Sequence, residues 1–223
     1  MNKTVYIVGA GEMEPDGPEI PDGAFVIAAD GGLKHLKKIN IAPNLIVGDF
    51  DSLGFRPVGE NIIFHQPEKN DTDTLLAVNQ ALNLDVDTIV IYGGLGGRFD
   101  HSIANLQTLL YIKNRGVQGF LIGCGSICAV IRNEEIAFSE PLSGYVSVFS
   151  LSEISSGVYI RGLKYPLTNH TLLSEIPLGV SNEFTGEPSA VSVKNGTLAV
   201  MWQGRSYHPE HFSICLTPAD GQV

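Results

Sequence analysis

Six aspartates stand out because each lies at or just after the end of a short apolar segment typical of a β-strand. They are spread over the first half of the chain: Asp30, Asp49, Asp51, Asp71, Asp73 and Asp100. Two ionised carboxylates about 4 Å apart repel each other by roughly 4 kcal/mol at an effective dielectric constant near 20, so a cluster of them must hold cations or protons. Oxygen ligands without neighbouring His or Cys suit Mg²⁺. The alternative is that they are ordinary turn residues and helix N-caps.

Strand-like and helix-like segments alternate through this half of the chain. The predicted strands are residues 5–8, 25–29, 45–47, 62–65, 88–92 and 119–122, and the predicted helices are residues 33–38, 74–82 and 101–114. Apolar strands that alternate with helices indicate a parallel sheet covered on both faces, which is a three-layer α/β domain. Ligands of such sheets bind outside the carboxyl ends of the strands, so separate segments can bring the aspartates to one edge. Asp49 and Asp51 would also point the same way if the segment around Phe50 is extended.

From about residue 126 onward the pattern changes to short β-strands separated by Gly, Pro and Ser. Residues 127–131 and 136–138 flank Asn133-Glu134 and predict a hairpin. Residues 190–194 and 197–202 flank Asn195-Gly196, which is the strongest short hairpin signal. Residues 145–150 and 158–160 predict further strands. We therefore expect an α/β domain over residues 1–130 and an antiparallel β domain over residues 131–223.

The composition disfavours several classes of function. The 223 residues include 14 Lys and Arg against 24 Asp and Glu, a formal net charge of −10, which disfavours binding to nucleic acid or to an anionic membrane. Three cysteines fit a reducing compartment better than a disulfide framework. No apolar run approaches the roughly 20 residues of a membrane-spanning helix, and the N-terminus lacks a signal-peptide pattern. We expect a cytoplasmic protein.

A glycine-rich segment follows the strand predicted at residues 88–92, and it reads Gly93-Gly94-Leu95-Gly96-Gly97-Arg98. Such a segment lets the backbone approach a phosphate, and Arg98 adds a charged fork; the alternative is a flexible connection. The chain lacks the Gly-Lys pair of a P-loop. A zinc site at His208, His211 and Cys215 is not favoured, because no fourth ligand is apparent.

Five motifs resemble those of the thiamine pyrophosphokinase (thiamine diphosphokinase) family. Three lie in the first half: Gly48-Asp49-Phe50-Asp51-Ser52, Asn70-Asp71-Thr72-Asp73 and Gly93-Gly94-Leu95-Gly96-Gly97-Arg98-Phe99-Asp100-His101. Two lie in the second half: Gly162-Leu163-Lys164-Tyr165-Pro166-Leu167 and Gly179-Val180-Ser181-Asn182-Glu183-Phe184. The resemblance covers nearly the whole chain. It implies an α/β catalytic domain followed by a β-sandwich-like domain, in a homodimer whose substrate lies between the subunits.

The resemblance also implies an activity: transfer of the pyrophosphoryl group of ATP to the hydroxyl group of thiamine, giving thiamine diphosphate and AMP. It implies Mg²⁺ on Asp49, Asp51, Asp71 and Asp73, where the ion neutralises both carboxylates and phosphates. The nucleotide would be bound by Asp30, Gly94, Gly97, Arg98 and His101. The expected catalytic residues are Asp71, Asp73, Arg98 and Asp100, with Asp73 or Asp100 accepting the alcohol proton.

Thiamine carries a thiazolium cation beside an aminopyrimidine, so it favours an aromatic face and hydrogen-bonding partners. The two second-half motifs supply Tyr165, Ser181 and Asn182 as candidates, although Tyr165 would equally suit packing within its own domain. We expect Trp202 in the core. The alternatives are a pyrophosphokinase for another alcohol such as a pterin, a metal-dependent phosphohydrolase, and a non-catalytic nucleotide-binding or thiamine-sensing module.

Overall fold

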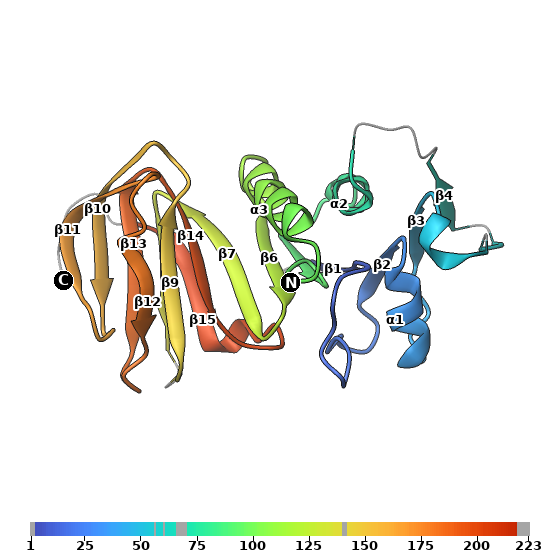
Figure 1. Cartoon of the computed structure of the whole chain (residues 1–223), viewed down its shortest axis with the longest axis horizontal. Coiled ribbons are helices and arrows are strands. Elements are labelled where there is room, and N and C mark those ends of the chain that lie inside the picture. The colour runs from blue at the N-terminus through green and yellow to red at the C-terminus, as the bar shows by residue number, and fades with distance from the viewer. Residues whose placement is uncertain (1–2, 56, 60, 66–70, 140–141, 218–223) are drawn as a thin grey trace. The chain divides into compact units, whose positions relative to one another are not determined.

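The chain folds into two compact units, shown in the computed structural model of Figure 1. The structure describes residues 3–55, 57–59, 61–65, 71–139 and 142–217. The first unit comprises the chain up to Ile127 together with Arg205–Tyr207, and the second comprises Cys128–Gly204 and the chain from His208.

The first unit is built on parallel strands. They are β1 (Thr4–Val8), β2 (Phe25–Ala29), β3 (Leu45–Gly48), β4 (Ile62–Phe64), β5 (Thr88–Tyr92) and β6 (Gln118–Gly123). Their order is β6-β5-β1-β2-β3-β4, with neighbouring strands parallel. After β1 the chain builds the sheet outward in one direction, and from β5 it builds in the other. The strand order therefore reverses between β1 and β5, which is where open α/β sheets form their ligand crevice.

Three helices cover this sheet: α1 (Gly32–Lys38), α2 (Asp73–Leu82) and α3 (Phe99–Lys113). Figure 1 shows α2 and α3 on one side of the strands and α1 on the other, as right-handed connections require when the strand order reverses. All five residues of β5 are buried, because both faces of the sheet are covered. The three-layer α/β prediction is confirmed, and each predicted strand and helix of this half is present with its ends within two residues.

The second unit packs two sheets of antiparallel strands. One contains β7 (Ser126–Arg132), β9 (Tyr145–Ser150), β12 (Gly179–Glu183) and β14 (Thr197–Gln203), in the order β12-β9-β14-β7. The other contains β8 (Glu134–Phe138), β10 (Ile154–Arg161), β11 (Leu167–Leu173), β13 (Ser189–Asn195) and β15 (Phe212–Leu216), in the order β11-β10-β13-β8-β15. The Phe138 ring from one sheet meets the Trp202 ring from the other edge to face, 5.3 Å apart. Trp202 is 4% exposed, so its predicted core position is confirmed.

The two predicted hairpins are wrong, because their strands lie in different sheets. The pair β7 and β8 is divided between the sheets, and so is the pair β13 and β14. The chain crosses from sheet to sheet at Asn133 (φ 53°) and at Gly196 (φ 127°). The crossings bond to each other: Gly196 N donates to Asn133 Oδ1 (3.0 Å) and Asn133 N donates to Gly196 O (3.2 Å). A turn residue permits the reversal, but burial of the apolar faces decides which sheet receives the next strand.

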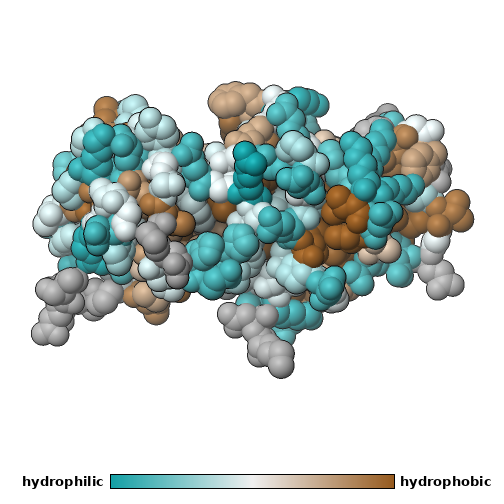
Figure 2. All heavy atoms as spheres, turned by 90° about the horizontal axis from the view of Figure 1, so that it is seen from below, coloured by the Kyte–Doolittle hydropathy of each residue, from teal (hydrophilic) through white to brown (hydrophobic). Residues whose placement is uncertain are grey.

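The surface carries few large apolar side chains relative to the core. Figure 2 shows one face, on which hydrophilic residues dominate and apolar residues gather in smaller groups. Among the described residues, no helix has both the length and the apolar character needed to span a membrane.

Candidate active site

A cavity of about 410 Å³ lies in the first unit at the carboxyl ends of β1 and β5, where the strand order reverses. Its wall includes backbone from Ala10 and Gly11, which follow β1, and from the glycine-rich segment that follows β5. Asp30, which follows β2, and Asp73, the first residue of α2, also line it. The topology therefore brings acidic side chains and glycine backbone to one cavity.

Three of the predicted aspartates meet at this edge. Asp30, Asp49 and Asp73 each offer a carboxylate oxygen, and these oxygens all lie within 4.8 Å of one another. Asp30 is 9% exposed, and its buried Oδ1 has no hydrogen-bond partner among the described residues. A buried carboxylate oxygen beside two further carboxylates is unfavourable unless a cation neutralises it. A donor set made only of carboxylate oxygens suits a hard cation such as Mg²⁺, so the residues present fit that ion.

Asp51 and Asp71 lie outside this cluster. Phe50 takes a left-handed conformation (φ 66°), and Asp51 then begins a 3₁₀ helix (Asp51–Leu53). The segment is not extended, so the expected alternation does not hold; instead the Asp51 N–H donates to Asp49 Oδ1 (3.1 Å). Asp71 is exposed two residues before α2.

Thr72 is the N-cap of α2, and its hydroxyl oxygen accepts a hydrogen bond from Leu75 N (3.2 Å). This cap places Asp73 in the first turn of the helix, where the helix dipole favours a negative charge. Asn70, part of the same motif, lies outside the described residues.

The glycine-rich segment is held in place by side chains of α3. Asn105 Nδ2 donates to Gly94 O (2.8 Å), and Gly96 N donates to Ser102 Oγ (3.1 Å). Gly96 has a φ of 86°, and a Cβ there would lie 1.9 Å from Cys124 Sγ. The segment is therefore anchored rather than a loose connection, and its backbone lines the cavity.

Arg98 and Asp100, predicted as catalytic, form an exposed ion pair. Arg98 Nη2 lies 2.7 Å from Asp100 Oδ2, and Arg98 Nε donates to Asp100 Oδ1 (3.3 Å). The hydrogen bond from Arg98 is the largest of the influences that hold the pKa of Asp100 below its ordinary value. Asp100 is thus a weakened proton acceptor. Arg98 and His101 both line the cavity.

Residues 12–23 form a loop whose anchoring the sequence did not predict. Glu12 lines the cavity, and its Oε2 accepts a hydrogen bond from Cys124 Sγ (3.4 Å). Glu14 Oε1 accepts from Gly125 N (2.9 Å), and the Glu19 carbonyl accepts from the Tyr92 hydroxyl (2.9 Å). Burial raises the pKa of Tyr92 to about 12, so this hydroxyl remains a donor at neutral pH. No local sequence pattern predicts these contacts, because the partners of Glu12 and Glu14 are 112 and 111 residues away in the chain.

In the second unit, Asn182 holds the segment that carries Tyr165. Asn182 is 4% exposed; its Oδ1 accepts from Tyr165 N (2.9 Å) and its Nδ2 donates to Tyr165 O (2.7 Å). The Tyr165 side chain itself is exposed. Ser181 is exposed on β12 with a φ of 58°, and its N–H donates to Ser147 Oγ (3.1 Å). The oxygen and the nitrogen of the Asn182 side-chain amide are therefore both hydrogen-bonded within the unit, whereas Tyr165 and Ser181 present exposed side chains.

Comparison with known proteins points to one family for both units. Residues 20–121 match the family described as "Thiamin pyrophosphokinase, catalytic domain", and residues 133–198 match "Thiamin pyrophosphokinase, vitamin B1 binding domain". The chain is 29% identical over 209 residues to the thiamine pyrophosphokinase of Bacillus subtilis (strain 168), covering 89% of this chain and 98% of that protein.

Two solved structures extend the similarity to the fold. A thiamin pyrophosphokinase family protein from Enterococcus faecalis is 30% identical with a TM-score of 0.74, and the match covers 89% of this chain and 98% of that one. The structure of the thiamine pyrophosphokinase from Bacillus subtilis is 25% identical with a TM-score of 0.77, and the match covers 91% and 99% of the two chains.

Proposed function

This chain belongs to the thiamin pyrophosphokinase family, and from this premise we propose which of its residues perform the reaction. Its activity is that of a thiamine diphosphokinase, with ATP and thiamine as substrates. The pyrophosphoryl group passes from ATP to the hydroxyl group of thiamine, giving thiamine diphosphate and AMP. The observation that carries our assignment is the group of three carboxylates, one with an unpartnered buried oxygen, at the edge of the glycine-lined cavity.

Asp30, Asp49 and Asp73 would hold the Mg²⁺. When bound there, the ion supplies positive charge that neutralises the carboxylates and the phosphates of ATP together. Asp51 and Asp71 remain predicted ligands; each lies two residues from a member of the cluster and has an exposed side chain that is open to solvent.

The phosphates would be bound by backbone of the glycine-rich segment, including Gly94 and Gly97, and by the Arg98 guanidinium. Gly97 supports this role because it lines the cavity, and a Cβ there would meet no atom closer than the Glu12 side chain at 3.8 Å. His101 and Asp30 complete the predicted nucleotide site, since both line the same cavity.

In the reaction, the hydroxyl oxygen of thiamine attacks the β-phosphorus of ATP. The bond from that phosphorus to the oxygen it shares with the α-phosphate breaks, and AMP leaves with the bonding electron pair. The hydroxyl proton would pass to Asp73 or Asp100, the two predicted acceptors, and a cation lies beside each: Asp73 would hold the Mg²⁺, and Arg98 holds the pKa of Asp100 below its ordinary value. The Asp100 carboxylate also orients the Arg98 guanidinium through two hydrogen bonds.

For thiamine, we assign contact to Tyr165 and Ser181 and a positioning role to Asn182. The exposed Tyr165 ring offers a face for the thiazolium cation. The Asn182 amide is already bonded on both sides to the Tyr165 backbone, so it orients the ring rather than binding the substrate.

A homodimer with substrate sites between its subunits, and a cytoplasmic location, complete the proposal. The second unit exposes Tyr145, Tyr165 and Val180, on or near the β9–β12 pair, as a surface that a second subunit would cover. Sedimentation at several protein concentrations tests the dimer, and a constant monomer mass would contradict it.

The activity is tested by identifying the nucleotide product. We expect AMP and thiamine diphosphate in equal amounts, and we expect both to require thiamine and Mg²⁺. Removing Mg²⁺ with a chelator should stop the reaction, and adding it back should restore it. ADP as the product, or AMP released at the same rate without thiamine, would contradict the assignment.

A further inference from the structure

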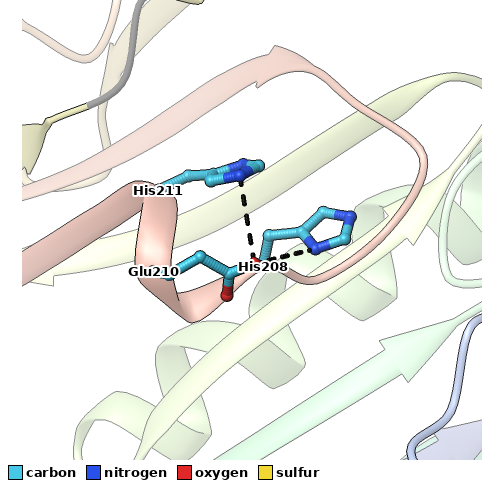
Figure 3. A group of neighbouring side chains, drawn as sticks. All are labelled: His208, Glu210 and His211. Atoms are coloured by element: carbon cyan, nitrogen blue, oxygen red, sulfur yellow. Dashed lines mark ion pairs between the residues drawn. The ribbon is translucent and has the colours of Figure 1, made fainter.

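Beyond the cavity, the described residues hold a second group of metal-ligating side chains, in the turn that precedes β15. His208, Glu210 and His211 each offer one ligand atom, and these atoms lie within 4.8 Å of one another. Figure 3 shows the Glu210 carboxylate facing both imidazoles. His208 Nδ1 is 3.3 Å and His211 Nε2 is 3.9 Å from the same carboxylate oxygen, Glu210 Oε1.

The backbone of this turn brings the two histidines together. Pro209, Glu210 and His211 form a 3₁₀ helix with a proline in its first turn, and His211 N donates to His208 O (3.0 Å). Residues three apart are eclipsed in a 3₁₀ helix, so the imidazoles stack with their centres 4.9 Å apart and their planes 31° apart. The spacing His-Pro-Glu-His therefore places two nitrogen ligands on the same side of the turn.

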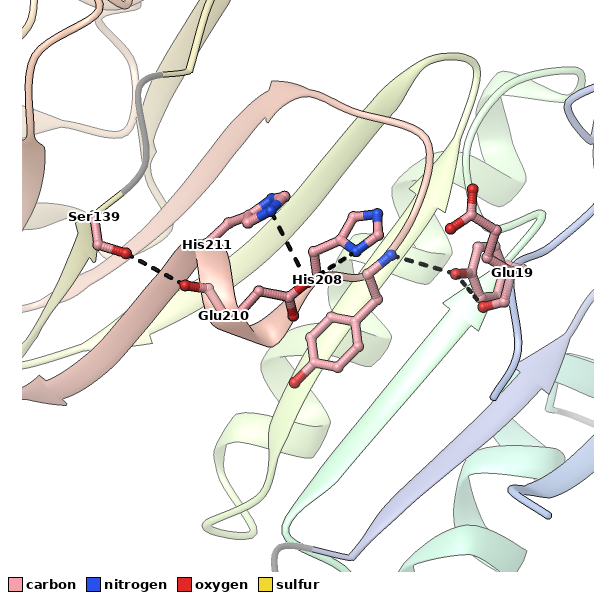
Figure 4. Close-up of polar contacts among 7 residues, drawn as sticks. Glu19, Ser139, His208, Glu210 and His211 are labelled. Atoms are coloured by element: carbon pink, nitrogen blue, oxygen red, sulfur yellow. Dashed lines mark hydrogen bonds and ion pairs between the residues drawn. The ribbon is translucent and has the colours of Figure 1, made fainter. Parts of the chain in front are cut away.

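Neighbouring strands of the same unit hold the turn on the sheet. Ser139 follows β8; its hydroxyl donates to the Glu210 carbonyl (3.3 Å), and its N–H donates to the His211 carbonyl (3.1 Å), the first of these contacts being drawn in Figure 4. The next residue, Phe212, pairs with Phe138 at the start of β15 and packs against Trp202 in the core. The three ligands are thus held on an anchored backbone. This favours metal binding because less conformational entropy is lost when the ion binds.

The structure assigns to His208, Glu210 and His211 a site for a borderline divalent cation of the Zn²⁺ type, separate from the carboxylate cluster of the cavity. Two imidazoles and one carboxylate suit Zn²⁺, Ni²⁺ and Cu²⁺ rather than Mg²⁺. In tetrahedral Zn²⁺ sites the ligand atoms lie about 3.4 Å apart, given metal–nitrogen distances near 2.0–2.1 Å. The distance from His208 Nδ1 to Glu210 Oε1 (3.3 Å) already has this value, the distance from His211 Nε2 to Glu210 Oε1 (3.9 Å) is longer by about 0.5 Å, and the ligand atoms of the two histidines lie within 4.8 Å of each other.

Charge at the site agrees with this assignment. The pKa of Glu210 is held below its ordinary value chiefly by a backbone hydrogen bond within its own residue; burial opposes this, and each of the two histidines lowers the pKa by less than burial raises it. The carboxylate is therefore ionised at neutral pH. All three side chains are partly open to solvent, at 42%, 64% and 38% exposure, so an ion can enter and keep water as a further ligand. The sequence offered Cys215 as the third ligand beside His208 and His211. In the structure Glu210 is the third ligand, and Cys215 lies farther along β15.

The test is a calorimetric titration in which Zn²⁺ is added to the full chain. The solution contains excess Mg²⁺ throughout, so that Mg²⁺ occupies the carboxylate cluster. We expect one Zn²⁺ per chain. His208→Ala and His211→Ala should each weaken binding by at least about tenfold, since even residues that only hydrogen-bond to a metal ligand contribute about 10–100-fold, and Glu210→Gln should weaken it too. The matched control is His170→Ala, which removes an exposed histidine on β11 of the same unit and should leave Zn²⁺ affinity unchanged.

Imidazole NMR signals provide a second readout that does not depend on enzyme activity. Addition of Zn²⁺ should shift the signals of His208 and His211 and leave those of His170 in place. Unchanged affinity in both histidine variants, or Zn²⁺ binding that is lost in Asp73→Asn but kept in those variants, would overturn the assignment. Absence of stoichiometric Zn²⁺ binding in excess Mg²⁺ would overturn it as well.

Discussion

At the scale of single residues, Asp30 combines two features that a purely structural residue rarely has. Its φ is 45°, a left-handed conformation that is unfavourable for most residues. Its buried Oδ1 has no hydrogen-bond partner in the described part of the chain. One residue therefore combines backbone strain with a buried polar atom that has no hydrogen-bond partner. This combination is typical of a residue that binds a cation.

Asp30→Asn removes the negative charge of the side chain and keeps its size and shape. Asparagine tolerates left-handed φ, so we expect the fold to be kept while turnover falls by more than about 100-fold and Mg²⁺ dependence shifts to higher concentration. The measurement is AMP formation against Mg²⁺ concentration, with circular dichroism to check the fold. Asp85→Asn, at an exposed aspartate of the same unit that also has a left-handed φ (53°) and lies outside the cluster, is the control and should leave turnover unchanged. Equal losses in both variants would remove Asp30 from the metal site.

The Arg98–Asp100 pair gives a titration that can be observed directly. Because Arg98 stabilises the ionised carboxylate, the pKa of Asp100 is lowered in the folded chain. The contribution of the pair to the free energy of unfolding is therefore fully present above the ordinary carboxyl pKa, and it is lost as the pH falls through the lowered pKa of the folded chain. Carboxyl ¹³C NMR should show the Asp100 midpoint rising in Arg98→Gln. The same midpoint in both proteins would show that Arg98 does not set it.

At the scale of elements, the glycine-rich segment fits closely around its neighbours. A Cβ on Gly96 would overlap Cys124 Sγ at 1.9 Å, whereas a Cβ on Gly97 would meet nothing closer than Glu12 at 3.8 Å. Both glycines have positive φ, 86° and 62°. A side chain would therefore cause backbone strain at either position, and only at position 96 would it also cause a steric clash.

These neighbours make a double-mutant test possible. Gly96→Ala should destabilise the protein through left-handed strain of about 1–2 kcal/mol and overpacking of about 1–3 kcal/mol. Adding Cys124→Ala should recover the stability lost through overpacking, because it removes the sulfur atom that the new Cβ would meet. Gly97→Ala should show the strain alone and should not respond to Cys124→Ala. Denaturant unfolding measures all five variants, and additive effects of Gly96→Ala and Cys124→Ala would contradict the packing shown by the structure.

At the scale of the whole molecule, two points where the chain crosses between sheets define the second unit. The crossings at Asn133 and Gly196 bond to each other, so both β7–β8 and β13–β14 change sheet at the same place. A Cβ on Gly196 would lie 2.5 Å from Ser155 Oγ and 2.8 Å from Ser155 Cα. Since one of these atoms is backbone, the clash cannot be relieved by turning a side chain.

Gly196→Ala should therefore destabilise the protein more than Gly186→Ala. Gly186 is in the same unit with a φ of 83° and has open space around it, so its substitution should lower the free energy of unfolding by about 1–2 kcal/mol from strain. Gly196→Ala should add about 1–3 kcal/mol from the clash with Ser155. The readout is the denaturant midpoint of each variant. Equal midpoints would indicate that the crossing can rearrange at little cost.

Much of the first unit could be predicted because its signals are local. Apolar runs, the acids that follow them and the glycines after β5 depend on strand and turn chemistry within a few residues, and the structure has these elements in place. The exclusion of Asp51 from the carboxylate cluster could not be predicted, because it depends on the left-handed turn at Phe50. The contacts of Glu12 and Glu14 were hidden for a related reason, since their partners come from the far end of the unit's sequence.

The sequence by itself determined the alternation of elements, the supply of carboxylates at strand ends and the resemblance to one family, since each depends on residue order alone. Only the tertiary structure decided that Asp30 joins Asp49 and Asp73, that Asn195-Gly196 leads to a change of sheet instead of a hairpin, and that Glu210 lies between two histidines. These outcomes depend on backbone conformation at single residues and on which apolar faces are buried together. Packing of the whole unit sets both, and no local pattern encodes them.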